Sequence, residues 1–162
     1  MSTSARLHED PGIYLHKLAQ TGKGAVEQHL AMEGAAGFYG GTPALAALVC
    51  KGLPFSELET LRAQLDLPLD RLAQFLGLAR ATVHRRKASG HLNADESDKV
   101  LRFARLLGQA AKVFGGITGA RAWLETPQYG LAGAVPLAFA GTEVGAREVE
   151  NLIGRIDHGV YS

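Results

Sequence analysis

Residues 93–115 read NADESDKVLRFARLLGQAAKVFG, a long helical pattern. The apolar residues of this stretch recur at helical spacing and share one stripe, while most charged residues fall elsewhere. The stripe contains Val100, Phe103, Ala104, Leu107, Ala111 and Phe114. Asn93 and Glu96 have the spacing of an N-cap and capping box, and Gly115-Gly116 supplies a stop. The pattern predicts a core helix with one face buried, against which the rest of the chain packs.

Residues 69–88 read LDRLAQFLGLARATVHRRKA, and they predict a helix-turn-helix. Ala73 is small where two helices would approach each other, and Gly77 stands where the turn needs a positive φ. One residue departs from the pattern, because Arg86 occupies a position, three after Val83, that is usually apolar. The small shared core is expected to consist of Leu72, Leu76, Leu78 and Val83.

The second helix of this motif is strongly basic. The formal net charge is only +1, but no acidic residue lies between Arg71 and Ala94. A local basic cluster in a nearly neutral protein indicates an anionic partner at one site, and nucleic acid fits best. Arg80, Thr82 and His84 are expected to face a major groove and the other cations to contact phosphates. The DNA-binding candidates are Arg80, Thr82, His84, Arg85, Arg86 and Lys87. The alternative is a solvated basic helix of a bundle, since three-helix motifs also occur as packing units.

Composition predicts a mainly α protein. Alanine and leucine dominate, β-branched residues are scarce, and 46% hydrophobic with 20% charged residues is ordinary for a globular protein. Cys50 is the only cysteine, so neither an internal disulfide nor a cysteine metal cluster is expected. The first residues lack the pattern of a signal peptide and no apolar run is long enough to span a membrane, which predicts a cytoplasmic location.

Further helices are predicted from their end signals. Thr42-Pro43 would open a short helix through Cys50, and Ser56 with Glu59 would form the capping box of a helix that Pro68 ends. Thr118 would cap a helix that contains Trp123, a predicted core residue. Thr142 would cap a last helix, ended by Gly159, whose apolar face is formed by Val149, Leu152, Ile153 and Ile156. Val160 and Tyr161 follow Gly159 and must either fold back or enter a partner.

A series of motifs in the second half of the chain resembles one family. These are Gly90-His-Leu-Asn-Ala-Asp-Glu-Ser97, Arg102-Phe-Ala104, Val113-Phe-Gly115, Ala122-Trp-Leu124, Pro136-Leu137, Gly145 and Gly159-Val-Tyr161. They resemble the Xre/MbcA/ParS toxin-binding family over residues 90–162. The helix-turn-helix, with Thr82-Val83 and Arg85, is similar to the DNA-binding half of the same antitoxins. The resemblance thus extends over residues 55–162.

The resemblance implies an antitoxin of a type II toxin–antitoxin pair. The usual partner would be a RES-domain toxin that degrades NAD, bound through the C-terminal domain, and the antitoxin would repress its own operon. Because one helix-turn-helix buries too little surface for tight specific binding, operator DNA is expected to be bound by a homodimer within a toxin–antitoxin hetero-oligomer. No cofactor is expected. Three parts of the chain are expected: an N-terminal helical, partly flexible segment without a recognised motif (1–52), a helix-turn-helix DNA-binding domain (53–91) and a compact helical toxin-binding domain with a C-terminal tail (92–162).

The tail is the expected inhibitory element. Gly159 would supply a turn, Val160 and Tyr161 would enter an apolar cleft of the toxin, and the carboxylate of Ser162 would pair with a toxin cation. The toxin-binding candidates are Gly159, Val160, Tyr161 and Ser162, together with Arg155 and His158. The alternative is that the tail packs on its own helix and the toxin is blocked by bulk elsewhere.

Two rival functions are weaker. The six histidines do not share a helical spacing with a carboxylate that would suggest a metal site or a general base, and no glycine-rich phosphate loop follows a strand, so an enzyme is not expected. A stand-alone transcriptional regulator would share the helix-turn-helix, but it would need an effector site or a dimerisation helix where this chain has the Gly-Val-Tyr segment. A RES-fold gene beside this one would favour the antitoxin.

Overall fold

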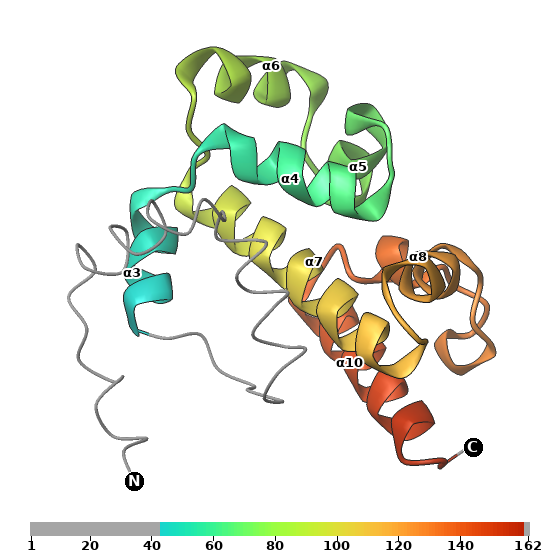
Figure 1. The fold of residues 1–162 in the computed structure, drawn as a ribbon. Coiled ribbons are helices and arrows are strands. Elements are labelled where there is room, and N and C mark those ends of the chain that lie inside the picture. The colour runs from blue at the N-terminus through green and yellow to red at the C-terminus, as the bar shows by residue number, and fades with distance from the viewer. Residues whose placement is uncertain (1–42, 161–162) are drawn as a thin grey trace, which may run out of the picture.

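The computed structural model describes residues 43–160, and these form a helical protein, as the composition predicts (Figure 1). The helices are α3 (Pro43–Lys51), α4 (Phe55–Leu65), α5 (Leu69–Phe75), α6 (Arg80–Ser89), α7 (Ala94–Val113), α8 (Ile117–Glu125), α9 (Pro136–Phe139) and α10 (Glu143–Asp157). A 3-10 turn, η2 (Tyr129–Leu131), precedes α9. None of these helices is long and apolar enough to cross a membrane. The Thr42 cap, Tyr161 and Ser162 lie outside the described residues.

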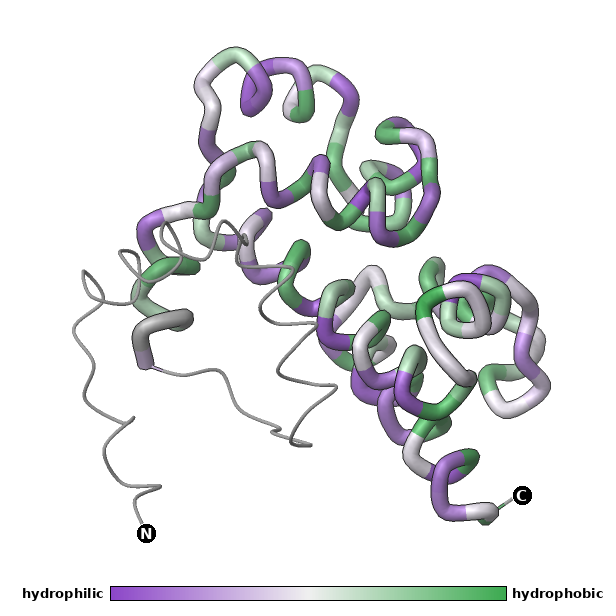
Figure 2. The backbone as a smooth tube through the Cα atoms, in the orientation of Figure 1, coloured by the Kyte–Doolittle hydropathy of each residue, from purple (hydrophilic) through white to green (hydrophobic). Residues whose placement is uncertain are grey.

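The long helix α7 is the centre of the fold. It packs against α3, α4, α8 and α10 (Figure 1). Hydrophobic positions recur along it between hydrophilic ones (Figure 2). The predicted stripe is confirmed: Val100, Phe103, Ala104 and Leu107 are buried, and Ala111 and Phe114 are partly buried. Burial extends beyond this stripe to Leu101, Leu106 and Ala110, because helices cover α7 from several directions.

Both ends of α7 form as predicted. The Asn93 side chain accepts a hydrogen bond from the Glu96 backbone N–H (2.8 Å), and the Glu96 carboxylate accepts one from the Asn93 N–H (2.8 Å). This capping box satisfies two N–H groups that a helix start leaves free. At the other end Gly115 adopts φ +78°, and the Gly116 N–H donates to the Ala111 carbonyl (2.8 Å).

A short backbone clamp ties α7 to the helix-turn-helix. The Leu92 N–H donates to the Leu53 carbonyl and the Phe55 N–H to the Gly90 carbonyl, both at 2.8 Å. The buried Ser97 hydroxyl accepts from the Leu53 N–H (2.8 Å). Gly52 adopts φ +90° beside the clamp, and a Cβ there would overlap the Leu92 carbonyl oxygen. The clamp therefore holds the segment that leads into α4 beside the segment that follows α6.

Two predicted caps are wrong. Helix α4 begins one residue earlier, at Phe55, whose N–H donates to the Gly90 carbonyl of the clamp, and its N-cap is Pro54, which has no side-chain acceptor. Ser56 therefore lies inside the helix and forms no capping box with Glu59. Helix α8 begins at Ile117 after Gly116, so Thr118 is also an interior position.

The C-terminal helices close over the far half of α7. Thr142 caps α10 as predicted, by accepting from the Gly145 N–H (3.1 Å). Val149, Leu152 and Ile153 are buried and Ile156 is partly buried, which confirms the predicted face of α10. Trp123 is only partly buried and stacks on Phe114 with ring centroids 4.9 Å apart. It lies at the edge of the core and not within it, because it packs on the end of α7.

Candidate nucleic-acid and partner-binding surfaces

Helices α5 and α6 form the predicted helix-turn-helix. Leu72, Leu76 and Val83 are buried between them, and Leu78 is partly buried. Ala73 is buried at the close approach, and its carbonyl accepts from the Leu78 N–H (2.8 Å). Gly77 adopts φ +67°, the left-handed conformation expected in the turn. The local sequence thus specifies both helices and the turn between them.

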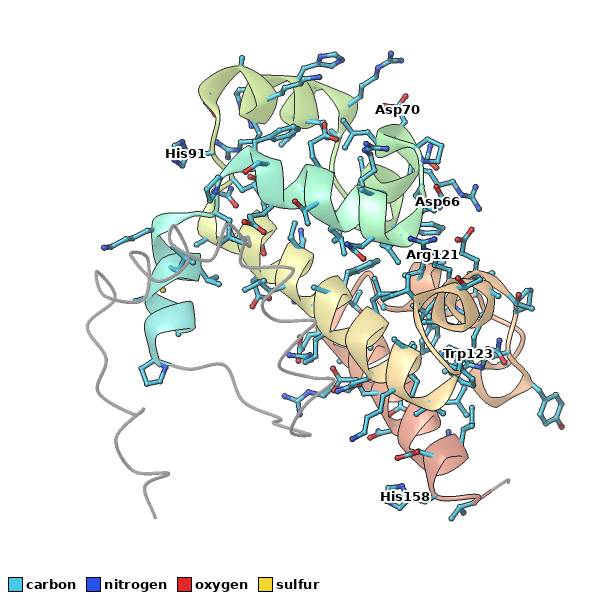
Figure 3. All side chains as sticks on the ribbon, in the orientation of Figure 1. Asp66, Asp70, His91, Arg121, Trp123 and His158 are labelled. Carbon is cyan, nitrogen blue, oxygen red and sulfur yellow. The ribbon has the colours of Figure 1, made fainter. Side chains whose placement is uncertain are left out.

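Helix α6 presents the basic candidates at the edge of the molecule. The helix lies on the side of α4 away from α7 (Figure 1), and its side chains extend outward (Figure 3). Arg80, His84, Arg85 and Lys87 are exposed, and Thr82 is partly exposed. Three full positive charges on one exposed helix, with no acidic residue from Arg71 to Ala94, produce a positive surface.

Arg86 has a different environment from the other five candidates. Its Nε donates to both carboxylate oxygens of Glu96, at 2.7 and 3.0 Å, and the side chains are 25% and 5% exposed. Glu96 is also half of the capping box, so one carboxylate joins the end of α6 to the start of α7. We therefore assign Arg86 a structural role: its ion pair replaces the apolar contact that the motif usually has at this position.

Substitution of Glu96 tests this assignment. Glu96→Ala should lower the free energy of unfolding by about 2–4 kcal/mol, because it removes a cap and leaves the Arg86 guanidinium without its partner. Glu96→Gln, which keeps an acceptor for the capping box, should cost less than half of that. Urea unfolding followed by circular dichroism measures both. A loss below about 0.5 kcal/mol for Glu96→Ala would show that the ion pair contributes little.

The end of α10 positions the start of the tail. The Gly159 N–H donates to the Ile156 carbonyl (3.1 Å) and the Val160 N–H to the Arg155 carbonyl (2.9 Å). With Gly159 at φ +68°, these two bonds make a Schellman motif, so Gly159 supplies the turn that the sequence predicts. Val160 leaves this turn 56% exposed. The chain beyond α10 therefore starts in a fixed direction.

A groove brings together three of the toxin-binding candidates. Arg155, His158 and Val160 line it, with Glu148, Glu150, Asn151 and Gly154. The His158 ring is held against α10, with Nδ1 2.7 Å from the Gly154 carbonyl oxygen. Within residues 43–160, the buried Nε of Arg155 has no hydrogen-bond partner. The groove thus combines an apolar side chain, unused hydrogen-bonding capacity and mixed charges.

One contact between the two halves of the chain had no sequence signal. Arg121 on α8 donates from Nε to the Gln64 carbonyl (2.6 Å) and from Nη2 to the Ala63 carbonyl (3.4 Å), at the C-terminus of α4 (Figure 3). A guanidinium is favourable there because the last carbonyls of a helix carry partial negative charge. Arg121 therefore fixes the helix-turn-helix against the C-terminal half.

The architecture defines the class of protein: a helix-turn-helix unit joined through one shared helix to a second helical unit. Residues 44–105 match the Antitoxin Xre-like helix-turn-helix domain, and residues 109–159 match the Antitoxin Xre/MbcA/ParS C-terminal toxin-binding domain. The chain belongs to the Xre antitoxin family. This is a family of antitoxins and not of enzymes, and we assign no catalytic residue.

Curated relatives agree with this assignment. The chain is 34% identical over 113 residues to Antitoxin Xre of Yersinia enterocolitica, which covers 68% of this chain and 76% of the relative. It is 33% identical over 122 residues to Antitoxin Xre of Photorhabdus laumondii, and this match covers 74% of this chain and 82% of the relative. A shorter match to Antitoxin Xre of Pseudomonas putida is 34% identical over 68 residues, and it covers 42% of this chain and 43% of the relative.

Proposed function

We propose that this chain is the antitoxin of a type II pair that neutralises a RES-domain, NAD-degrading toxin and represses its own operon. The observation that carries the proposal is the position of α7, which packs against both an exposed basic helix-turn-helix and the helices of a domain matched as toxin-binding. One rigid helix thus places a DNA-binding surface and a protein-binding surface on the same molecule.

Coexpression with the neighbouring gene tests the proposal as a whole. The product of that gene should be toxic alone and harmless with this chain, and the two should copurify as one complex. NAD loss should follow expression of the toxin alone. A neighbour that is not toxic and does not copurify would leave a stand-alone transcriptional regulator as the function.

Operator binding is assigned to the exposed side chains of α6. Arg80 and Thr82 lie in the first turn of that helix and His84 in the next, where residues of a recognition helix contact base edges. Arg85 and Lys87 are suited to phosphate contacts. Because one helix-turn-helix buries too little surface for tight specific binding, the DNA-bound form is proposed to be a homodimer or a higher assembly.

Substitutions on α6 should separate affinity from specificity. Arg85→Ala with Lys87→Ala should weaken binding to every DNA sequence and reduce the salt slope by roughly 2, because about one condensed ion is released per phosphate contact. Arg80→Ala should instead cost about 1–3 kcal/mol on the operator and relax the sequence preference. Titrations of operator and unrelated DNA at several salt concentrations measure both effects. Unchanged operator affinity in the Arg80/Arg85/Lys87 triple variant, with a native thermal melt, would reject the interface.

Toxin inhibition is assigned to the end of α10. The Schellman turn leaves Val160 half-exposed in the groove that Arg155 and His158 also line, and this exposure supports the proposal that the tail enters a partner. An apolar and aromatic pair following a fixed turn is suited to a cleft that binds a dinucleotide, since it offers burial and ring stacking. The competing mechanism is occlusion by the body of the domain, and truncation of the segment distinguishes the two.

A further inference from the structure

A long segment of the toxin-binding domain carries no charge. Between Glu125 and Glu143 the sequence reads TPQYGLAGAVPLAFAGT, residues 126–142, without an acidic or basic side chain. Charged residues are depleted at the centres of protein–protein interfaces and aromatic residues are enriched there. This segment also lacks the cations that a nucleic-acid surface needs, in contrast to α6.

One aromatic side chain of this segment is almost fully exposed. Tyr129 is 96% exposed, the highest value among the exposed large hydrophobic residues of the described chain. An isolated exposed apolar residue is ordinary on a protein surface. The backbone around Tyr129 is what makes it unusual.

The loop that carries Tyr129 is closely hydrogen-bonded. The Gly133 N–H donates to the Gln128 carbonyl (2.9 Å), the Gln128 N–H donates to the Ala134 carbonyl (3.1 Å), and the Ala132 N–H donates to the Tyr129 carbonyl (3.0 Å). The Gln128 side-chain amide donates to the Trp123 and Thr126 carbonyls, at 3.1 and 2.9 Å. These hydrogen bonds therefore fix the position of the Tyr129 Cα in the free protein.

The same loop also packs against α10. Leu131 is buried, and Gly130 lies so close to the Leu152 side chain that a Cβ there would be 2.7 Å from it. Leu152 follows Asn151, a lining residue of the α10 groove, so the loop adjoins the helix that carries the tail. An aromatic side chain on a preordered loop loses little conformational entropy on binding, a property of interface anchors.

We propose that Tyr129 is a docking anchor for the toxin, separate from residues 159–162, and that it inserts into an apolar pocket on the toxin surface. This inference rests on the proposed function. The toxin is favoured as the occupant because Tyr129 lies within residues 109–159, matched as toxin-binding, and its loop is continuous with the helix of the tail. The alternative occupant is a second copy of this chain, and it makes a different prediction, because a contact between copies would be present without toxin.

The test measures the affinity of the full-length chain for the purified protein encoded by the adjacent gene. Tyr129→Ala should weaken the complex by about 30-fold or more, as truncation of an aromatic anchor does, with no change in melting temperature or operator affinity. Tyr129→Phe keeps the ring and should stay within about threefold of wild type. Val144→Ala is the matched control, because Val144 is 73% exposed but stands outside the charge-free segment, between Glu143 and Arg147.

Each outcome decides a different claim. Absence of binding by the wild-type chain contradicts the proposed function, whereas equal binding by wild type and Tyr129→Ala overturns only the anchor. An equal loss in Val144→Ala would overturn the assignment to this loop. Sedimentation without toxin completes the test: a wild-type dimer that Tyr129→Ala converts to monomer would assign the loop to self-association and overturn the toxin as its occupant.

Discussion

A chain lacking residues 160–162 should bind toxin and operator DNA yet no longer inhibit NAD degradation. The buried side chains of α10 all precede Gly154, and Val160 contributes one hydrogen bond to the end of the helix, from its N–H to the Arg155 carbonyl. Folding should therefore be nearly unaffected. If the tail occupies the active site of the toxin, NAD loss should rise from background to nearly the rate of free toxin.

The assay requires the truncated chain in saturating complex with toxin, so that lost affinity is not mistaken for lost inhibition. Tyr129→Ala at the same saturation serves as the opposite control, because it should weaken binding and leave inhibition of the bound toxin intact. Full inhibition by the truncated chain would show that occlusion by the domain, and not the tail, silences the toxin.

The sequence identifies those features that depend on neighbours along the chain. The capping box of Asn93 and Glu96, the stop at Gly115 and the turn at Gly77 each need residues only a few positions apart, and all three form as predicted. The stripe of α7 follows from helical periodicity alone. Local signals of this kind were sufficient to place the helix-turn-helix and the central helix.

Long-range contacts account for what the sequence could not show. Phe55 begins α4 because Gly90, distant in sequence, accepts its N–H, and this contact overrides the capping signal at Ser56. The pairing of Arg86 with Glu96 likewise depends on how α6 meets α7. A basic residue on a recognition helix gives the same sequence signal whether it binds phosphate or a carboxylate of its own chain. Burial in the folded structure distinguishes the two.

The same contacts indicate how the two surfaces are related in space. The clamp at Leu53 and Leu92 fixes one end of the helix-turn-helix to the start of α7, and Arg121 fixes the end of α4 to α8. Toxin bound at α10 and DNA bound at α6 would therefore be held at a defined separation and angle. Such rigidity is needed if one toxin–antitoxin assembly is to place two recognition helices on successive half-sites.

Phe103→Ala should unfold the protein or lower its free energy of unfolding by about 3–5 kcal/mol, a large share of the roughly 5–15 kcal/mol of a typical domain. Phe103 is fully buried on α7, the helix against which both halves pack, so DNA binding and toxin binding should fail together. Trp123→Ala should cost less, about 1–3 kcal/mol, because the ring is partly exposed and loses mainly its stacking on Phe114.

Urea unfolding measures the effect of Phe103→Ala when it is followed by two probes. Circular dichroism reports on all the helices, whereas fluorescence reports on the C-terminal half, because Trp123 is the only tryptophan. If α7 unites the two halves, the two transitions should coincide in the wild type and shift together in Phe103→Ala. Separate transitions, with the fluorescence change alone moved by the substitution, would mean that the halves unfold independently and that α7 belongs energetically to the toxin-binding half.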